Sequence, residues 1–125
     1  MKPLNYVIFA RVSSREQERE GHSLEGQVGE LVKWAEKHEG KVLKIFKIAE
    51  TATRSIERKT FHEMVAFVRK QRHEISAVLV YKLDRAARNM KDYIALETLE
   101  EELGINLIAI TQETQTIPLA EWHAE

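Results

Sequence analysis

The residues of this chain that could do chemistry are serines and arginines in two short segments, residues 11–14 (RVSS) and 82–88 (KLDRAAR). A serine hydroxyl is a poor nucleophile at neutral pH without a base or a reactive electrophile. No histidine stands near Ser13 or Ser14, so a Ser-His-Asp arrangement has little support. Guanidinium groups stay charged, bind phosphate oxygens in pairs and stabilise the charge of phosphoryl transfer. The combination predicts chemistry on a phosphodiester or a phosphate ester.

The sequence lacks the motifs of other common catalytic and cofactor-binding sites. There is no cysteine, which excludes thiol nucleophiles and thiolate zinc sites. Neither the P-loop pattern nor the dinucleotide-binding glycine pattern occurs, and the five histidines are scattered without metal-ligand spacing. We therefore expect no metal and no cofactor.

Length and composition indicate one intracellular globular domain. The chain has 125 residues, 43% hydrophobic and 31% charged, and no apolar run long enough to span a membrane. Residues 54–91 carry ten Lys or Arg against four Asp or Glu, whereas residues 92–125 carry eight acids and no Lys or Arg. A basic middle segment favours an anionic partner, and the alternative is a solvated helix face.

The apolar pattern alternates between strands and helices. Strands are expected at 4–12, 41–49, 75–81 and 105–111. One helix should begin after Ser23 as N-cap and stop near Gly40, a second should carry Phe61, Met64, Val65 and Val68, and a third should span 90–103 before Gly104. Residues 50–58 are polar and are expected to form a loop.

This order predicts an α/β three-layer sandwich with a mostly parallel sheet of four to five strands. Active sites in open α/β sheets form beyond the carboxyl ends of the strands. Residues 11–14, 50–58 and 82–85 all leave such ends. We therefore expect them to build one site.

Three stretches of the chain resemble the sequence motifs of a known family. The stretch Tyr6 to Gln17 (YVIFARVSSREQ) is similar to the first strand and serine turn of serine site-specific recombinases, the resolvases, invertases and large serine integrases. Residues 23–27 (SLEGQ) look like the start of their first helix, and residues 81–89 (YKLDRAARN) look like their "K-L-D-R-x-x-R" segment. The resemblance covers essentially the whole chain and implies a resolvase-like fold.

Carried over by position, the resemblance implies that Ser13 is the nucleophile and Arg11 stands beside it. Arg85 and Arg88 would hold the scissile phosphate, and Asp84 would orient them. The further DNA- or phosphate-binding residues it implies are Arg58, in the segment before the second helix, together with Gln17, Gln27 and Lys82.

Competing assignments stay open for several of these residues. Ser13 could merely end its strand, and Ser14 is the neighbouring candidate. Arg85 and Arg88 share a helix face and could form salt bridges with Asp84 and Asp92.

The loop at 50–59 departs from the family pattern because it lacks the Ser-Gly and Arg-Pro features common there. The aim of Arg58 is therefore open, and Arg54 competes with it for a phosphate.

The resemblance implies a DNA recombinase that cleaves and rejoins double-stranded DNA through a 5′-phosphoserine intermediate. Residues 1–125 would be its catalytic domain, with a dimerisation helix starting at 117–125 and a DNA-binding domain absent. The complete enzyme would be a cytoplasmic homodimer or tetramer, and the isolated fragment a monomer or weak oligomer inactive in recombination. The alternatives are a non-catalytic α/β regulatory or interaction domain and a metal-independent phosphatase.

Overall fold

The computed structural model describes residues 4–11, 23–49, 52–82, 87 and 90–111. Within these ranges four strands form one parallel sheet in the order β2-β1-β3-β4. The strands are β1 (Asn5–Arg11), β2 (Lys41–Ile48), β3 (Ala77–Val80) and β4 (Asn106–Ala109). The helices are α2 (Leu24–Lys37), α3 (Arg54–Lys70) and α4 (Met90–Leu103).

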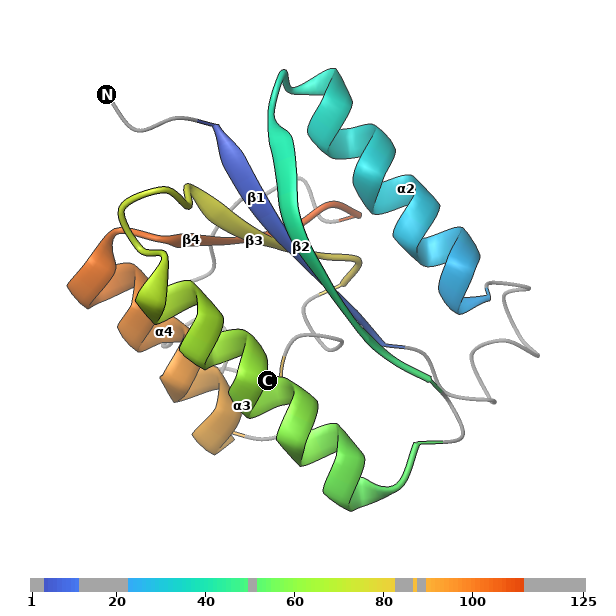
Figure 1. Cartoon of the computed structure of the whole chain (residues 1–125), viewed down its shortest axis with the longest axis vertical. Coiled ribbons are helices and arrows are strands. Elements are labelled where there is room, and N and C mark those ends of the chain that lie inside the picture. The colour runs from blue at the N-terminus through green and yellow to red at the C-terminus, as the bar shows by residue number, and fades with distance from the viewer. Residues whose placement is uncertain (1–3, 12–22, 50–51, 83–86, 88–89, 112–125) are drawn as a thin grey trace.

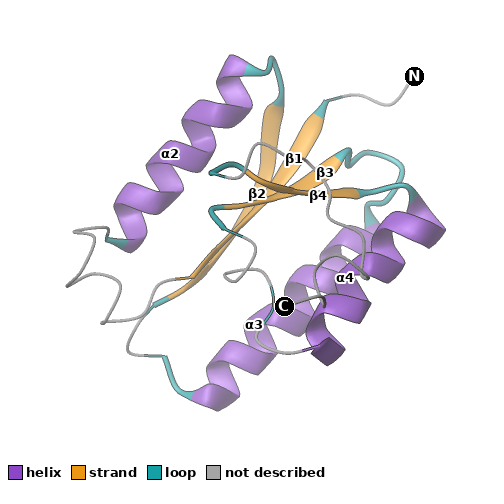
Figure 2. Ribbon diagram, turned by 180° about the vertical axis from the view of Figure 1, so that it is seen from behind, coloured by secondary structure: helices purple, strands orange, loops and turns teal. Residues whose placement is uncertain are grey.

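The helices cover both faces of the sheet. Helix α2 lies on one face, and α3 and α4 lie together on the other (Figure 1). The view from behind shows the same three layers (Figure 2). The expected α/β three-layer sandwich is confirmed, and the described sheet is parallel throughout.

Strand β1 supplies side chains to both halves of the core. Val7 and Phe9 belong to the apolar cluster that includes side chains of α3 and α4. Tyr6, Ile8 and Ala10 belong to the cluster that includes side chains of α2. This alternation follows from the two-residue period of a strand. It explains why the interior of β1 reads as an unbroken apolar run, as is typical of a parallel strand covered on both faces.

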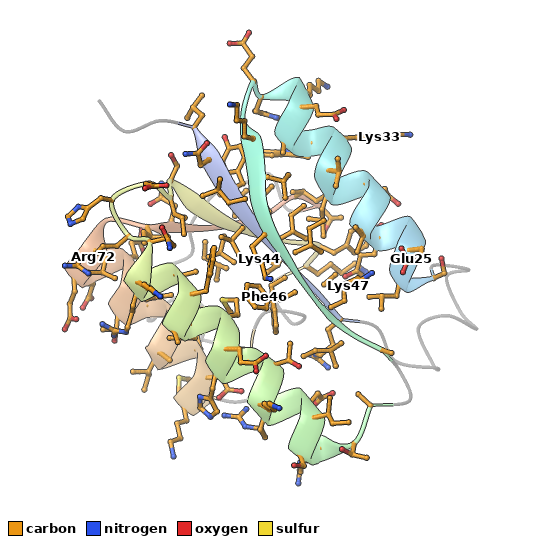
Figure 3. The ribbon with its side chains drawn as sticks, viewed as in Figure 1. Glu25, Lys33, Lys44, Phe46, Lys47 and Arg72 are labelled. Atoms are coloured by element: carbon orange, nitrogen blue, oxygen red, sulfur yellow. The ribbon has the colours of Figure 1, made fainter. Side chains whose placement is uncertain are left out.

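Strand β2 lies at the edge of the sheet and is largely exposed. Three lysines at spacings of three residues project from it, Lys41, Lys44 and Lys47, and the last two are visible along the strand in Figure 3. Lysine on an edge strand disfavours pairing with another chain. Lys47 also pairs at 3.4 Å with Glu25 in the first turn of α2, an exposed contact.

Most expected boundaries agree with the structure to within two residues. Ser23 is the N-cap of α2, and its hydroxyl accepts a hydrogen bond from the Gly26 N–H at 3.0 Å. Gly104 has a φ of 72°, which suits a glycine ending α4. Strands β3 and β4 are shorter than expected, although Ile75 and Tyr81 beside β3 are still buried.

Residues 50–58 were expected to form a loop, and this expectation is wrong for its second half. Helix α3 begins at Arg54, because the Thr53 hydroxyl accepts a hydrogen bond from the Ile56 N–H at 3.2 Å and caps it. Thr53 followed by Glu57 in the first turn is the sequence signal that could have indicated this start.

Gly40 ends the α2 segment for a reason other than the expected one. The left-handed conformation after α2 belongs to Glu39, with a φ of 61°. A Cβ on Gly40 would overlap the ring of Tyr6 and lie 2.9 Å from the Leu4 carbonyl oxygen. A glycine is therefore required at position 40, because no Cβ fits between the α2–β2 turn and the first strand.

Gly40→Ala should destabilise the chain by about 1–3 kcal/mol, because the Tyr6 ring is itself held edge-on against Trp34 and cannot move freely. Gly29→Ala is the matched control. Gly29 is exposed inside α2 with open space around it, so alanine should stabilise by about 0.5–1 kcal/mol. Urea unfolding followed by circular dichroism measures both, and equal effects of the two substitutions would contradict the assignment.

Candidate active site

The carboxyl ends of the strands define one edge of the sheet. Arg11 ends β1, Ile48 ends β2, and Tyr81 and Lys82 follow β3. The chain passes from β1 to β2 on one side and then crosses back to β3 on the other, so the strand order reverses beside β1. Ligand sites in open α/β sheets lie at such a reversal.

The two chemistry-bearing segments leave this edge from adjacent strands. Ser13 and Gln17 follow β1, and Asp84, Arg85 and Arg88 follow β3, which pairs in parallel with β1. These five residues lie outside the described residues. The structure does describe the other predicted site residues, Arg11, Gln27, Arg58 and Lys82.

Gln27 ties the end of β1 to the first turn of α2. Its side chain is buried, and its Oε1 accepts a hydrogen bond from the Arg11 backbone N–H at 3.2 Å. The contact holds the backbone at the last residue of β1. A role of the Gln27 side chain in binding DNA stays a prediction.

Arg58 stands inside α3 and not in a segment before the second helix, which corrects the prediction. Its Nη1 and Nη2 donate to the two carboxylate oxygens of Asp92 at 2.6 and 2.9 Å. The guanidinium carbon also lies 5.3 Å from the centre of the Phe61 ring. The arginine is thus held by a two-pronged ion pair on one side and an aromatic face on another.

Asp92 pairs with Arg58, whereas the sequence suggested it only as a salt-bridge partner of Arg85 and Arg88. Its side chain is 4% exposed, in the first turn of α4. Asp92, Leu96 and Leu99 recur at helical spacing and are all buried. A carboxylate on the apolar face of a helix is the signal that could have identified it, because buried charges need a partner.

Arg11 and Arg58 line the same small pocket, beside two acids, Asp92 and Glu57. Phe9, Ile48 and Phe61 complete its walls. The pocket volume of about 20 Å³ is room for one water molecule. A phosphate would therefore approach its mouth and not its interior. Arg54 is exposed one turn earlier on α3 and is not among the described lining residues.

The remaining features of the described chain do not add a second site of this kind. Lys82 is half-buried at the same edge, just after Tyr81, whose carbonyl accepts a hydrogen bond from the Thr111 hydroxyl at 2.7 Å. Burial raises the pKa of the Tyr6 phenol, but Tyr6 lies near the opposite end of β1.

Within the described ranges no cluster of three or more metal-ligating side chains occurs. Among the helices described, none is long and apolar enough to cross a membrane.

The Arg58–Asp92 pair should respond asymmetrically to substitution. Arg58→Met removes both hydrogen bonds that Arg58 donates to the buried Asp92 carboxylate and should cost about 3 kcal/mol or more. Asp92→Leu leaves an arginine that is 33% exposed and can be hydrated, so it should cost clearly less. The double variant should recover most of the loss, because apolar side chains can replace a buried ion pair. Urea unfolding of the three variants measures this.

Arg69→Met is the matched control, since Arg69 and Glu102 join the same two helices at 3.8 Å but are both exposed. It should change the stability by less than about 0.5 kcal/mol. Equal losses for Arg58→Met and Asp92→Leu, or losses that simply add in the double variant, would be inconsistent with a buried, mutually dependent pair.

Comparison with known proteins identifies the family of the chain. Residues 6–121 match the family model described as "Resolvase, N terminal domain". The chain is 33% identical over 108 residues to the transposon Tn917 resolvase of Enterococcus faecalis. The matched region covers 86% of this chain and 50% of the Tn917 resolvase. The chain thus spans about half the length of the curated relative it matches.

Solved structures show the same fold. A resolvase family site-specific recombinase from Streptococcus pneumoniae superposes with a TM-score of 0.71 at 30% identity, covering 90% of this chain and 75% of that one. The N-terminal catalytic domain of TP901-1 integrase superposes with a TM-score of 0.64 at 27% identity, covering 86% and 78%. With its sequence matched over residues 6–121 and its fold shared with these recombinases, the chain belongs to the resolvase family of serine recombinases.

Proposed function

We propose that this chain is the catalytic domain of a site-specific recombinase that cleaves and rejoins double-stranded DNA through a 5′-phosphoserine intermediate. The observation that carries the proposal is the position of the RVSS and KLDRAAR segments. In the sequence they follow the paired strands β1 and β3, whose carboxyl ends lie at the edge of the sheet where Arg11 and Arg58 line one pocket. Membership of the resolvase family supports this proposal and does not favour the alternative of a non-catalytic interaction domain.

The proposed first step is an in-line displacement at phosphorus. The Ser13 hydroxyl oxygen forms a bond to the scissile phosphate, and the bond from phosphorus to the 3′ oxygen breaks. The serine gives up its proton, and the departing 3′ oxygen gains one. The product is a DNA 5′ end joined to Ser13 and a free 3′ hydroxyl. Attack by a 3′ hydroxyl on the phosphoserine reverses the step and rejoins the strand.

The arginines supply the charge stabilisation that this step needs. The phosphate carries more negative charge on its outer oxygens as the fifth bond forms, and guanidinium groups stabilise that charge. We assign this work to Arg11, Arg85 and Arg88, with Asp84 orienting the pair. Arg58, Gln17, Gln27 and Lys82 would contact the DNA or its phosphates. The phosphodiester energy stays in the covalent bond, so the mechanism requires no nucleotide cofactor.

The partners follow from the same proposal. The substrate is a recombination site in double-stranded DNA, and strand exchange would take place within a dimer or tetramer of the complete protein. We expect the protein to act in the cytoplasm.

Ser13→Ala should abolish covalent attachment to DNA in the complete protein that contains this chain. The probe is a set of nicked duplexes cut from the DNA surrounding the gene, since a nick near the crossover lets a short strand diffuse away and traps the adduct. The readout is a detergent-resistant protein–DNA band. Loss of one hydroxyl should leave the thermal unfolding midpoint nearly unchanged.

Ser14→Ala is the control, because it removes the neighbouring hydroxyl and should retain measurable adduct. Adducts that persist in Ser13→Ala and vanish in Ser14→Ala would move the nucleophile by one residue. A wild-type protein that forms no adduct with any of the duplexes would favour the non-catalytic reading.

A further inference from the structure

We infer that Asp92 is a positioning residue for the reaction, acting by holding the Arg58 guanidinium in place beside Arg11. The inference rests on the proposed function, in which Arg58 contacts a DNA phosphate. It starts from the observation that a carboxylate on α4 meets an arginine on α3 at the pocket on the sheet's carboxyl edge.

The geometry of the contact restricts Arg58 strongly. Two parallel hydrogen bonds, at 2.6 and 2.9 Å, fix the plane of the guanidinium and not only its distance. The Phe61 ring, 5.3 Å away, contacts the same group from another direction. Arginine otherwise has a long side chain with many rotamers, so this anchoring limits where its remaining N–H groups can point.

The exposures of the two partners suit an anchor and a group that meets a ligand. Asp92 is 4% exposed, whereas the Arg58 side chain is 33% exposed. The carboxylate is therefore fixed inside the protein, and the arginine extends from it to the surface at the mouth of the pocket.

Joining α3 to α4 is a weaker explanation of the pair. A buried ion pair contributes little more stability than apolar side chains of similar size. The neighbouring residues Tyr93, Leu96 and Leu99 already bury an apolar face of α4 in the core shared with α3. An aliphatic residue at position 92 would extend that face. What it could not do is orient an arginine at the same pocket as Arg11.

Positioning predicts a specific kinetic signature. Misplacing a charged group by about 1 Å can cost on the order of 10²-fold in rate. Asp92→Asn keeps the shape of the side chain but replaces one acceptor oxygen by an amide N–H₂, which cannot accept from Arg58. We expect the rate of adduct formation at saturating DNA to fall by about 10- to 100-fold. The DNA concentration giving half-maximal rate should change little.

The test is a double-mutant cycle in the complete protein, using the nicked duplex that gives most adduct with the wild type. Asp92→Asn, Arg58→Met and the double variant are compared at a temperature where circular dichroism shows each of them folded. If Asp92 acts through Arg58, adding Asp92→Asn to Arg58→Met should lower the rate no further. Asp92→Glu, which keeps both acceptor oxygens, should recover part of the rate.

Glu102→Gln is the matched control, because Glu102 also joins α4 to α3 but is exposed and stands in the last turns of the helix. It should leave the rate unchanged. The inference is overturned if Asp92→Asn reacts at the wild-type rate, or if its loss multiplies in full with that of Arg58→Met. A wild type without any adduct would instead refute the proposed function, so the two failures are distinguishable.

Discussion

Strand β1 is bonded to a neighbour on each side and buried on both faces, and the rest of the molecule depends on that constraint. It pairs in parallel with β2 over its whole length and with β3 over its first half. Its alternate side chains enter both apolar clusters. The position at which β1 ends is therefore determined by the entire core. Arg11 occupies that position, and the Gln27 side chain fixes its backbone by accepting the Arg11 N–H.

The candidate site is the place where both helical layers meet the end of this strand. Helix α2 reaches it through Gln27, from one face. Helices α3 and α4 reach it from the other face through Arg58 and Asp92. A buried carboxylate is tolerated there because it has a charged partner in good geometry. The Arg11 backbone and the Arg58 guanidinium are therefore held from opposite sides of the sheet. Such preorganisation is what stabilisation of a charged transition state requires.

Much of the fold could be predicted from the sequence, because its strands and helix ends depend on local signals. The strand β1, the Ser23 cap of α2 and the left-handed Gly104 are each encoded within a few residues. The resemblance to serine recombinases rests on three short stretches, residues 6–17, 23–27 and 81–89, each of which can be recognised without knowledge of the fold. Long-range contacts were not predictable in the same way. Gly40 is needed because Tyr6, far away in sequence, occupies its Cβ space. The Arg58–Asp92 ion pair joins residues 34 positions apart in the sequence. Arg58 lies in a helix and not in the expected loop, because Thr53 caps α3 and the helix begins at Arg54.

In the proposed function Ser13, which follows β1 in the sequence, carries out the chemistry, and locating the covalent bond tests this role most directly. The trapped adduct would be digested with protease and nuclease, and the remaining nucleotide located by tandem mass spectrometry. The account predicts a nucleotide joined through its 5′ phosphate to Ser13. A nucleotide on Ser14, on a tyrosine or on any other residue, or one joined through a 3′ phosphate, would contradict it.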